Sequence, residues 1–317
     1  MPNEFRKDVV SGDWTLVAPS RAKRPDAPES RHEWEDSHQS IDECPFEHLS
    51  EGFVFVMPNK YPALQPGVCG EPVQRGPFLI QSANGFHDLV ITRDHERHMA
   101  DFTDQETTQV LGAYQDRYRV ISKDECGDYI SIFHNYRREA GASVWHNHSQ
   151  ILSTPIVPPE VRRSLHGAHR YFQEHQHTVH CAVIAWELEQ QKRIIFENDR
   201  FVVFCPFVSK TPYEMRVFPK EHASRFEATT LDDLKLCAQA LNAALHGLHK
   251  GLGDPPFNFY IHTAPVQKDP DANYDYYHWH IEIVPKIKID AGFELGTGLY
   301  MNPVDPDAAA EKIRKAL

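Results

Sequence analysis

The sequence predicts an α+β fold built from two related halves, each an antiparallel sheet with helices, and two observations lead to this prediction. The first is a repeated order of motifs: a Cys/His pair, a single histidine, a helix and a further histidine follow one another twice along the chain. A motif order that recurs in this way is typical of an internal duplication. The second is that strand-like segments occur in hairpin-like pairs, which favours antiparallel sheets.

The predicted strands are short segments rich in apolar, β-branched and aromatic residues. They cover residues 53–59, 88–93, 129–135, 200–207, 214–220 and 258–263. Corresponding points of the two repeats keep similar separations, since His95 and His146 are 51 residues apart and His222 and His278 are 56 apart. We therefore place one half at residues 1–165 and the other at residues 166–317.

Three helix starts are marked by capping residues. Thr103 and Glu106 form the pattern of a capping box, in which the threonine oxygen accepts a backbone N–H and the glutamate reaches back. Thr230 and Asp233 form a weaker version before a long helical segment. Pro306 follows an aspartate and predicts the start of a last helix, because proline suits the first helical position.

The composition is that of a globular protein. The chain has 317 residues, 41% of them hydrophobic and 25% charged, with a net charge of −12. This negative charge argues against a nucleic-acid partner, which needs a basic surface. No membrane-length apolar run and no signal-peptide core occur, so we expect a cytoplasmic protein without a membrane partner. Six cysteines over this length do not predict a disulfide framework, so we expect buried thiols or metal ligands.

Two closely spaced histidines stand in the segment SVWHNHSQILSTPIVPP. In an extended strand, alternate residues lie on one face, so His146, His148 and Gln150 would form one polar row. Such a row beside apolar sequence predicts a functional site.

Metal-binding residues recur at corresponding positions of both repeats. Zinc prefers four nitrogen or sulfur ligands in a tetrahedron, often two from a turn and two from distant strands. The candidate ligands are Cys44, His48, His95 and His146 in the first half, and His177, Cys181, His222 and His278 in the second. Glu47 is the alternative to His48, and His180 is the alternative to His177. The first half is the favoured zinc site, and occupancy of the second is open.

The segment GASVWHNHSQ resembles the active-site motif of the galactose-1-phosphate uridylyltransferase branch of the histidine-triad superfamily. Further segments resemble the family in the same order across nearly the whole chain, namely DWTLVAPSRAKRP, CPFEH, VMPNKYPAL, FHDLVITRDHERH and GFELGTGLYMNP. The resemblance implies duplicated histidine-triad-like halves, a homodimer, and as partners a nucleotide sugar with a sugar 1-phosphate or phosphate.

The resemblance also implies residue roles. His148 would be the catalytic nucleophile, His146 a zinc ligand, and Gln150 a catalytic hydrogen-bond donor to the phosphoryl oxygens. The substrate-binding residues that it implies are Arg21, Arg24, Asn59, Asn135, Gly141 and Ser143. Because a neutral amide cannot protonate a leaving group, Gln150 favours transfer over hydrolysis.

The first functional hypothesis is the transfer of UMP between UDP-hexose and hexose 1-phosphate, in a ping-pong reaction through a covalent nucleotidyl-histidine. The alternatives are an ADP-sugar phosphorylase or adenylyltransferase, and a non-catalytic zinc protein that binds nucleotide. The segment GFELGTGLYMNP resembles ADP-sugar phosphorylases, with Tyr300 near the place of a sugar-binding glutamine. A second metal set with Cys181, His222 and His278 resembles that of the phosphorylases, whereas one drawn from His262, His278 and His280 would resemble that of the uridylyltransferases. The nucleobase, the hexose and the acceptor stay open.

Overall fold

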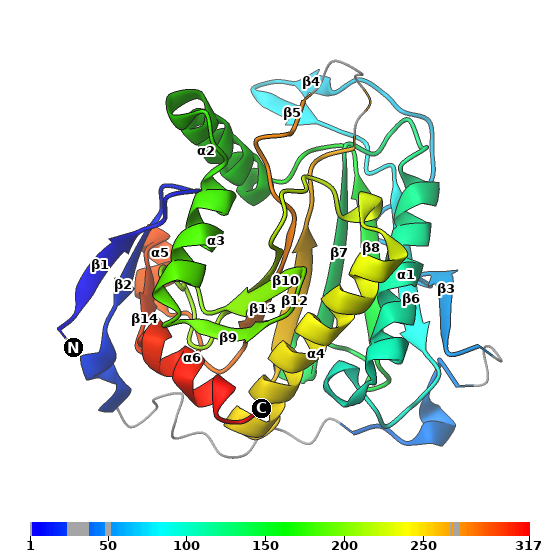
Figure 1. The fold of residues 1–317 in the computed structure, drawn as a ribbon. Helices are drawn as coiled ribbons and strands as arrows, with labels where there is room; N and C mark the ends of the chain where they lie inside the picture. The colour runs from blue at the N-terminus through cyan, green and yellow to red at the C-terminus, as the bar shows by residue number, and fades with distance from the viewer. Residues whose placement is uncertain (1, 24–37, 48–51, 267, 269–272) are drawn as a thin grey trace.

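The computed structural model describes residues 2–23, 38–47, 52–266, 268 and 273–317 (Figure 1). Its largest element is one nine-stranded sheet in which every neighbouring pair of strands is antiparallel. The strands, in spatial order, are β3 (Val54–Pro58), β6 (Phe86–Thr92), β8 (His148–Thr154), β7 (Tyr129–Tyr136), β12 (Phe257–His262), β13 (His280–Pro285), β11 (Met215–Pro219), β10 (Phe201–Phe204) and β9 (Ile194–Glu197). All six predicted strands are present.

The order of strands is mirrored about the middle of the sheet. From the centre outward, the first half runs β7, β8, β6, β3 and the second runs β12, β13, β11, β10, with β9 added at the edge. One long helix follows the corresponding strand in each half, α1 (Asp104–Ile121) after β6 and α4 (Leu231–Leu252) after β11. The predicted α+β fold with duplicated halves is confirmed.

The halves differ from the prediction in sharing one sheet instead of forming two. Strand β7 pairs with β12 from Ile132 opposite Ile261 to Tyr136 opposite Phe257. The helices α1 and α4 lie side by side across one face of this sheet (Figure 1). Their buried residues form one hydrophobic core with strands of both halves. The boundary predicted after residue 165 falls inside α2 (Pro159–His175), and the division of the chain stays a prediction.

The remaining elements cover the second half and the edges. Helix α3 (Val179–Gln190) packs on the face of the sheet opposite to α4, through a buried cluster with β9, β10 and β11. Helix α6 (Pro306–Arg314) packs on α4. The smaller elements are the sheet β1 (Glu4–Lys7), β2 (Trp14–Val17) and β14 (Tyr300–Asn302), the hairpin β4 (Val73–Arg75) and β5 (Phe78–Ile80), and α5 (Gly292–Thr297).

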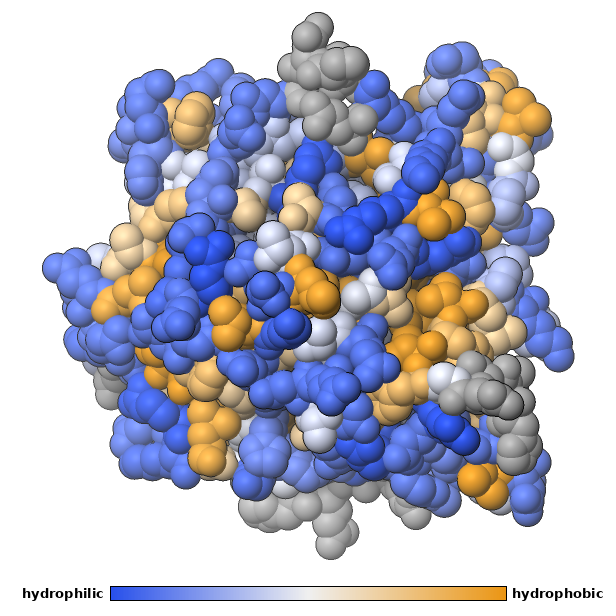
Figure 2. All heavy atoms as spheres, turned by 45° about the vertical axis from the view of Figure 1, so that its right-hand side comes forward, coloured by the Kyte–Doolittle hydropathy of each residue, from blue (hydrophilic) through white to orange (hydrophobic). Residues whose placement is uncertain are grey.

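The surface and the helices agree with the composition. On the face shown in Figure 2, hydrophilic residues predominate and apolar residues appear in small groups between them. None of the helices in the described part of the chain combines the length and the apolar character needed to cross a membrane.

A disulfide between Cys69 and Cys126 departs from the expectation of free thiols. It joins the segment between β3 and β6 to the turn before β7, across 57 residues of sequence. This disulfide was not predictable from the sequence, because the two cysteines lie in separate loops. The other four cysteines are free, and two of them, Cys205 and Cys237, are buried as expected.

The helix caps form largely as predicted. The Thr103 hydroxyl accepts a hydrogen bond from the Glu106 N–H, and the Glu106 carboxylate accepts one from the Thr103 N–H. Thr230 caps α4 by accepting from the Asp233 N–H. Asp305 occupies the N-cap of α6, but it makes no capping hydrogen bond and is paired with Arg6 instead.

The capping glutamate of α1 predicts a pH-dependent stability. Two hydrogen bonds from the Arg97 guanidinium lower the pKa of Glu106 to about 2. A carboxyl whose pKa is lowered by folding stabilises the protein above its unfolded pKa of about 4.3, and loses this effect as the pH falls towards its folded pKa. We expect Glu106→Gln, which can still cap, to lower Tm by roughly 1–2 °C at pH 7. The difference should disappear between pH 5 and pH 2 in thermal scans, and a constant difference would contradict the assignment.

Candidate active site and metal clusters

Two of the three residues of the predicted polar row, His148 and Gln150, lie together at the start of β8. The strand begins at His148, so His146 lies in the bend before it instead of on the strand as expected. His148 and Gln150 are two residues apart on β8 and face the same side of the sheet. Phe133 of β7 lies opposite Gln150. This side is the face away from α1 and α4, which pack against the alternate residues.

Backbone hydrogen bonding fixes the tautomer of His148. Its Nδ1 lies 2.8 Å from the carbonyl oxygen of His146, and a carbonyl can only accept. The ring proton is therefore on Nδ1, and Nε2 carries an unprotonated lone pair. Burial lowers the pKa of His148, whose residue is only 7% exposed, so the ring is neutral near pH 7. Phe46 lies edge-on to the ring at 5.3 Å between centroids.

Gln150 is held from the neighbouring strand. His87 of β6 lies with Nε2 2.8 Å from Gln150 Oε1, and its Nδ1 accepts a hydrogen bond from the Ala63 N–H at 3.0 Å. Asn59, predicted to lie near the nucleoside, has its Nδ2 3.1 Å from the same His87 nitrogen. Asn59 therefore lies next to the row.

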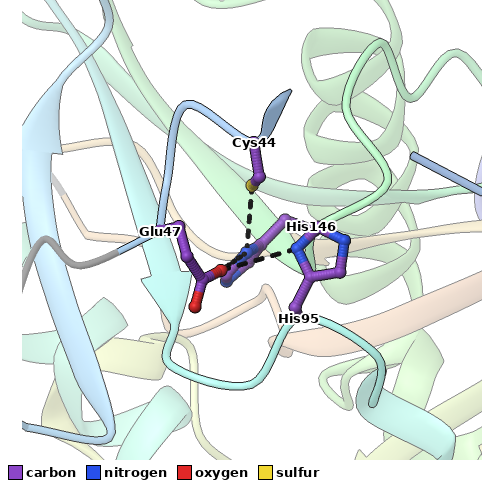
Figure 3. Close-up of side chains that lie close together, drawn as sticks. All are labelled: Cys44, Glu47, His95 and His146. Atoms are coloured by element: carbon purple, nitrogen blue, oxygen red, sulfur yellow. Dashed lines mark hydrogen bonds and ion pairs between the residues drawn. The ribbon is translucent and has the colours of Figure 1, made fainter. Parts of the chain in front are cut away.

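Three residues of the first predicted metal set converge on one point together with Glu47, the alternative to His48 (Figure 3). Cys44, Glu47, His95 and His146 each offer a ligand atom, and these atoms all lie within 4.8 Å of one another. Glu47 takes part in this group, whereas its alternative His48 lies outside the described residues. The separations are 3.3 Å from Cys44 Sγ to His146 Nδ1, and 3.5 and 3.6 Å from Glu47 Oε2 to Nδ1 of His95 and His146. A tetrahedron with zinc bonds of about 2.0–2.3 Å has edges of about 3.3–3.8 Å.

The protonation of this cluster fits a divalent metal. Nε2 of His146 donates to the Thr92 carbonyl at 2.6 Å and Nε2 of His95 to the Gln39 carbonyl at 2.8 Å, so both Nδ1 atoms face the centre without a proton. Glu47 Oε2 and His95 Nδ1 are buried without a hydrogen-bond partner, which is the state expected of metal ligands. Burial raises the pKa of the Cys44 thiol, so metal binding would release its proton. The donor set fits zinc.

The second predicted set forms a smaller cluster. Nδ1 of His278 lies 3.5 Å from Cys181 Sγ, and Nδ1 of His222 lies 3.7 Å from it. His278 donates from Nε2 to the Pro219 carbonyl, as His146 does to Thr92 in the first half. Burial lowers the pKa of His278 to about 3, so it is a neutral ligand. One thiolate and two neutral rings hold a cation less strongly than the two anionic ligands of the first cluster.

The two candidates for the fourth ligand of the second cluster, His177 and His180, lie in different places. His177 is exposed, and its ring atoms are not part of the group formed by Cys181, His222 and His278. His180 is buried and lies nearer to His280 than to His278, with 5.5 and 6.4 Å between ring centroids. The assignment of His177 stays a prediction. The alternative residues His262 and His280 form a separate group with Glu282, in which Glu282 is also paired with Arg216.

Two predicted substrate-binding residues, Gly141 and Ser143, lie in the loop before the histidines, and a third, Asn135, lies near the end of β7. Gly141 has a φ of 91°, a left-handed conformation that glycine adopts without strain, and ends the short helix η5 (Arg138–Ala140). Asn135 accepts a hydrogen bond from Asn258 Nδ2, which leaves its own amide group beside Gly141. Ser143 is exposed on the same loop. These residues thus lie on the chain segment that leads into His146.

Arg21, one of the two predicted arginines, is not brought to this site within one chain. Arg21 lies on the short helix η1 (Pro19–Lys23) after β2. Figure 1 shows this dark-blue turn on the opposite side of the molecule from β6 and β8. Arg24 lies outside the described residues.

The mirrored antiparallel sheet and the histidine row are those of the histidine-triad fold, and the following comparisons identify a nucleotidyltransferase family. A family described as "Domain of unknown function (DUF4921)" matches residues 79–317. An ADP-glucose phosphorylase from Arabidopsis thaliana is 34% identical over 98% of this chain and 92% of its own length. The chain belongs to the galactose-1-phosphate uridylyltransferase family, as the resemblance predicted.

Other relatives agree with this membership. A galactose-1-phosphate uridylyltransferase from Thermotoga maritima is 27% identical over 98% of each chain. The crystal structure of the Arabidopsis ADP-glucose phosphorylase with bound ADP-glucose matches with a TM-score of 0.82 and 31% identity, over 99% of each chain. A solved uridylyltransferase structure matches with a TM-score of 0.79 and 30% identity, over 99% of this chain and 98% of the other.

Two contributions to the site were missed in the sequence. His87 reaches Gln150 from an adjacent strand, and Phe46 covers His148 from the loop that carries Cys44. Both depend on pairing between distant segments, which a single sequence does not reveal. A weak signal existed for His87, because this histidine directly precedes the strand predicted at residues 88–93.

Proposed function

We propose that the protein transfers a nucleoside monophosphate from a nucleoside diphosphate sugar to an acceptor phosphate, with His148 as the nucleophile. The observation that carries this proposal is the hydrogen bond from His148 Nδ1 to the His146 carbonyl, which leaves Nε2 unprotonated. A neutral imidazole is a competent nucleophile, and its phosphorylated form is a good leaving group.

The reaction proceeds in two displacements. His148 Nε2 attacks the α-phosphorus, an Nε2–P bond forms, and the bond from the α-phosphorus to the bridging oxygen breaks as sugar 1-phosphate leaves. An oxygen of the acceptor phosphate then attacks the same phosphorus, and the Nε2–P bond breaks. The imidazole becomes positively charged in the intermediate, and the Nδ1–H to carbonyl bond stabilises that charge.

Gln150 suits transfer because the leaving group needs no proton. A sugar phosphate leaves as a stable anion, so a donor that cannot ionise is sufficient beside His148. The amide of Gln150 supplies hydrogen bonds to the non-bridging oxygens, where negative charge is concentrated. Catalysis then depends on positioning and charge stabilisation, as in other phosphoryl transfers.

Among the members of the class, an ADP-sugar phosphorylase is the first candidate. The relative of 34% identity is named ADP-glucose phosphorylase, and the segment GFELGTGLYMNP resembles such enzymes. The cluster of Cys181, His222 and His278 also matches the second metal set that the sequence resemblance associates with them. Transfer of UMP to hexose 1-phosphate is the second candidate. It is supported by the similarity to the Thermotoga uridylyltransferase, which extends over 98% of each chain.

Metal and oligomeric state complete the proposal. Zinc would be held by Cys44, Glu47, His95 and His146. The positive charge of the ion would balance the thiolate and the carboxylate, and the bound ion would connect the loop of Cys44 to the start of β8. A role for Arg21 in binding the nucleotide phosphates needs a second copy of the chain, because η1 lies away from β8 in the same chain. In the predicted homodimer, the second copy of the chain would supply this arginine.

A labelling experiment separates the two candidates. The protein is incubated with ADP-glucose or UDP-glucose carrying ³²P at the α-phosphorus, and acid-labile label on the protein is counted. We expect label from ADP-glucose that inorganic phosphate releases as ADP. Label from UDP-glucose, released by galactose 1-phosphate as UDP-galactose, would favour the second candidate. The absence of label from both would contradict the proposal.

A further inference from the structure

We propose that His87 is a positioning residue that fixes the orientation of the Gln150 amide. This inference rests on the proposed function, because it assigns His87 a part in the same transfer. His87 lies on β6, and its ring lies between the backbone of the segment before β6 and the side chain of Gln150.

The strand register explains why these two side chains meet. Leu89 of β6 lies directly opposite Gln150 of β8. His87 is two residues before Leu89 and thus points to the same side of the sheet. Residues in this diagonal arrangement are close enough for long side chains to interact. The contact of 2.8 Å between His87 Nε2 and Gln150 Oε1 follows from this register.

The backbone determines the direction of the hydrogen bonds. The Ala63 N–H can only donate, so His87 Nδ1 accepts and the single proton of the neutral ring lies on Nε2. Nε2 must therefore donate, and the Gln150 atom that faces it must be the amide oxygen. The Gln150 NH₂ group is then directed away from His87. Asn59 Nδ2 lies 3.1 Å from the same nitrogen, but two donors make no hydrogen bond, so this is a packing contact.

The segment that supplies the Ala63 N–H is itself held in place. Asn59 accepts a hydrogen bond from the Tyr61 N–H through Oδ1 at 2.8 Å. The Asn59 N–H donates to the carbonyl of His87 at 2.9 Å. The tautomer of His87 is thus set by backbone groups of a fixed turn and not by the substrate.

The amide orientation decides whether Gln150 attracts or repels a phosphoryl group. Non-bridging phosphoryl oxygens are negative, so an NH₂ group directed at them is favourable and an amide oxygen is not. Free rotation would allow both orientations, which differ by a half-turn of the terminal torsion. A donor at Nε2 of His87 selects the productive orientation before substrate binds, which is the preorganisation that transition-state stabilisation requires.

A double-mutant cycle tests this inference. The rate of covalent labelling and its KM are measured for the wild-type protein, His87→Ala, Gln150→Ala and the double variant. We expect His87→Ala to reduce the rate at saturation on the order of 10–100-fold, as supporting shells commonly do, with a smaller change in KM. In the Gln150→Ala background the same substitution should change the rate by less than about threefold, because residues that act through one another are not additive.

A conservative variant and a control separate positioning from folding. His87→Gln can accept from the Ala63 N–H and donate to Gln150, so it should recover most of the rate. His246→Ala removes a similarly half-buried histidine from α4 and should leave the labelling rate unchanged. An equal loss from His87→Ala in both backgrounds, or no recovery with His87→Gln, would overturn the inference. A wild-type protein that takes up no label would instead refute the proposed function itself.

Discussion

Replacing His148 with alanine is expected to abolish covalent labelling of the protein by nucleotide sugar. The variant removes the only atom, Nε2, that is placed to form a bond to phosphorus in the proposed reaction. Removing an enzyme nucleophile costs far more than removing a contact, so we expect the rate to fall at least about 10³-fold. The measurement is the rate of acid-labile ³²P incorporation from the α-phosphorus of ADP-glucose or UDP-glucose.

The loss should occur without loss of the fold. His148 lies beside the first cluster and not in it, so the variant should keep its metal content and most of its Tm. His246→Ala, far from the histidine row on α4, serves as the control that keeps the full labelling rate. If His148→Ala is still labelled, another residue is the nucleophile and the proposed mechanism is wrong.

The second large effect concerns the first metal cluster. Cys44→Ala removes one of its two anionic ligands, and the remaining carboxylate and rings would hold zinc much less tightly. Because His146 contributes both a ligand ring and the carbonyl that binds His148, metal loss should also disorder the nucleophile. We expect loss of one metal equivalent, a fall in Tm on the order of 5–10 °C and a labelling rate about 10–100-fold lower.

Elemental analysis, thermal scans and labelling together test this expectation. Cys237→Ala provides the matched control, because this buried thiol of α4 belongs to neither cluster. It should lower Tm by packing loss but keep the metal content and the labelling rate. Unchanged metal content in Cys44→Ala would contradict the assignment of the cluster, and unchanged labelling would separate the metal from the chemistry.

The parts of the fold that were predictable depend on local signals. Apolar, β-branched and aromatic content located the central strands, and the capping box at Thr103 located the start of α1. The repeated motif order indicated the duplication, because a duplication preserves sequence order. The pairing of β7 with β12 was not predictable, since no residue pattern records which edges of two sheets meet.

The site was predictable to a similar degree. The spacing of His148 and Gln150 identified two neighbouring residues of the site, and the repeated order of His and Cys residues identified three members of each cluster. The bend at His146 was not predicted because it accompanies a contact between the His146 ring and Cys44, which lies in a distant segment of the chain. The position of Arg21 relative to β8 was not predictable, because a loop sequence does not record where the loop lies in the fold.

The shared sheet makes the first half structurally dependent on the second. A chain cut between the halves would expose β7, whose backbone groups are paired with those of β12 from Ile132 to Tyr136. An exposed strand edge favours intermolecular association, and apolar residues of the first half such as Ile132 would lose part of their cover. The second half is thus needed to cover the β7 edge of the first half, and this structural role does not depend on any metal binding or chemistry of its own.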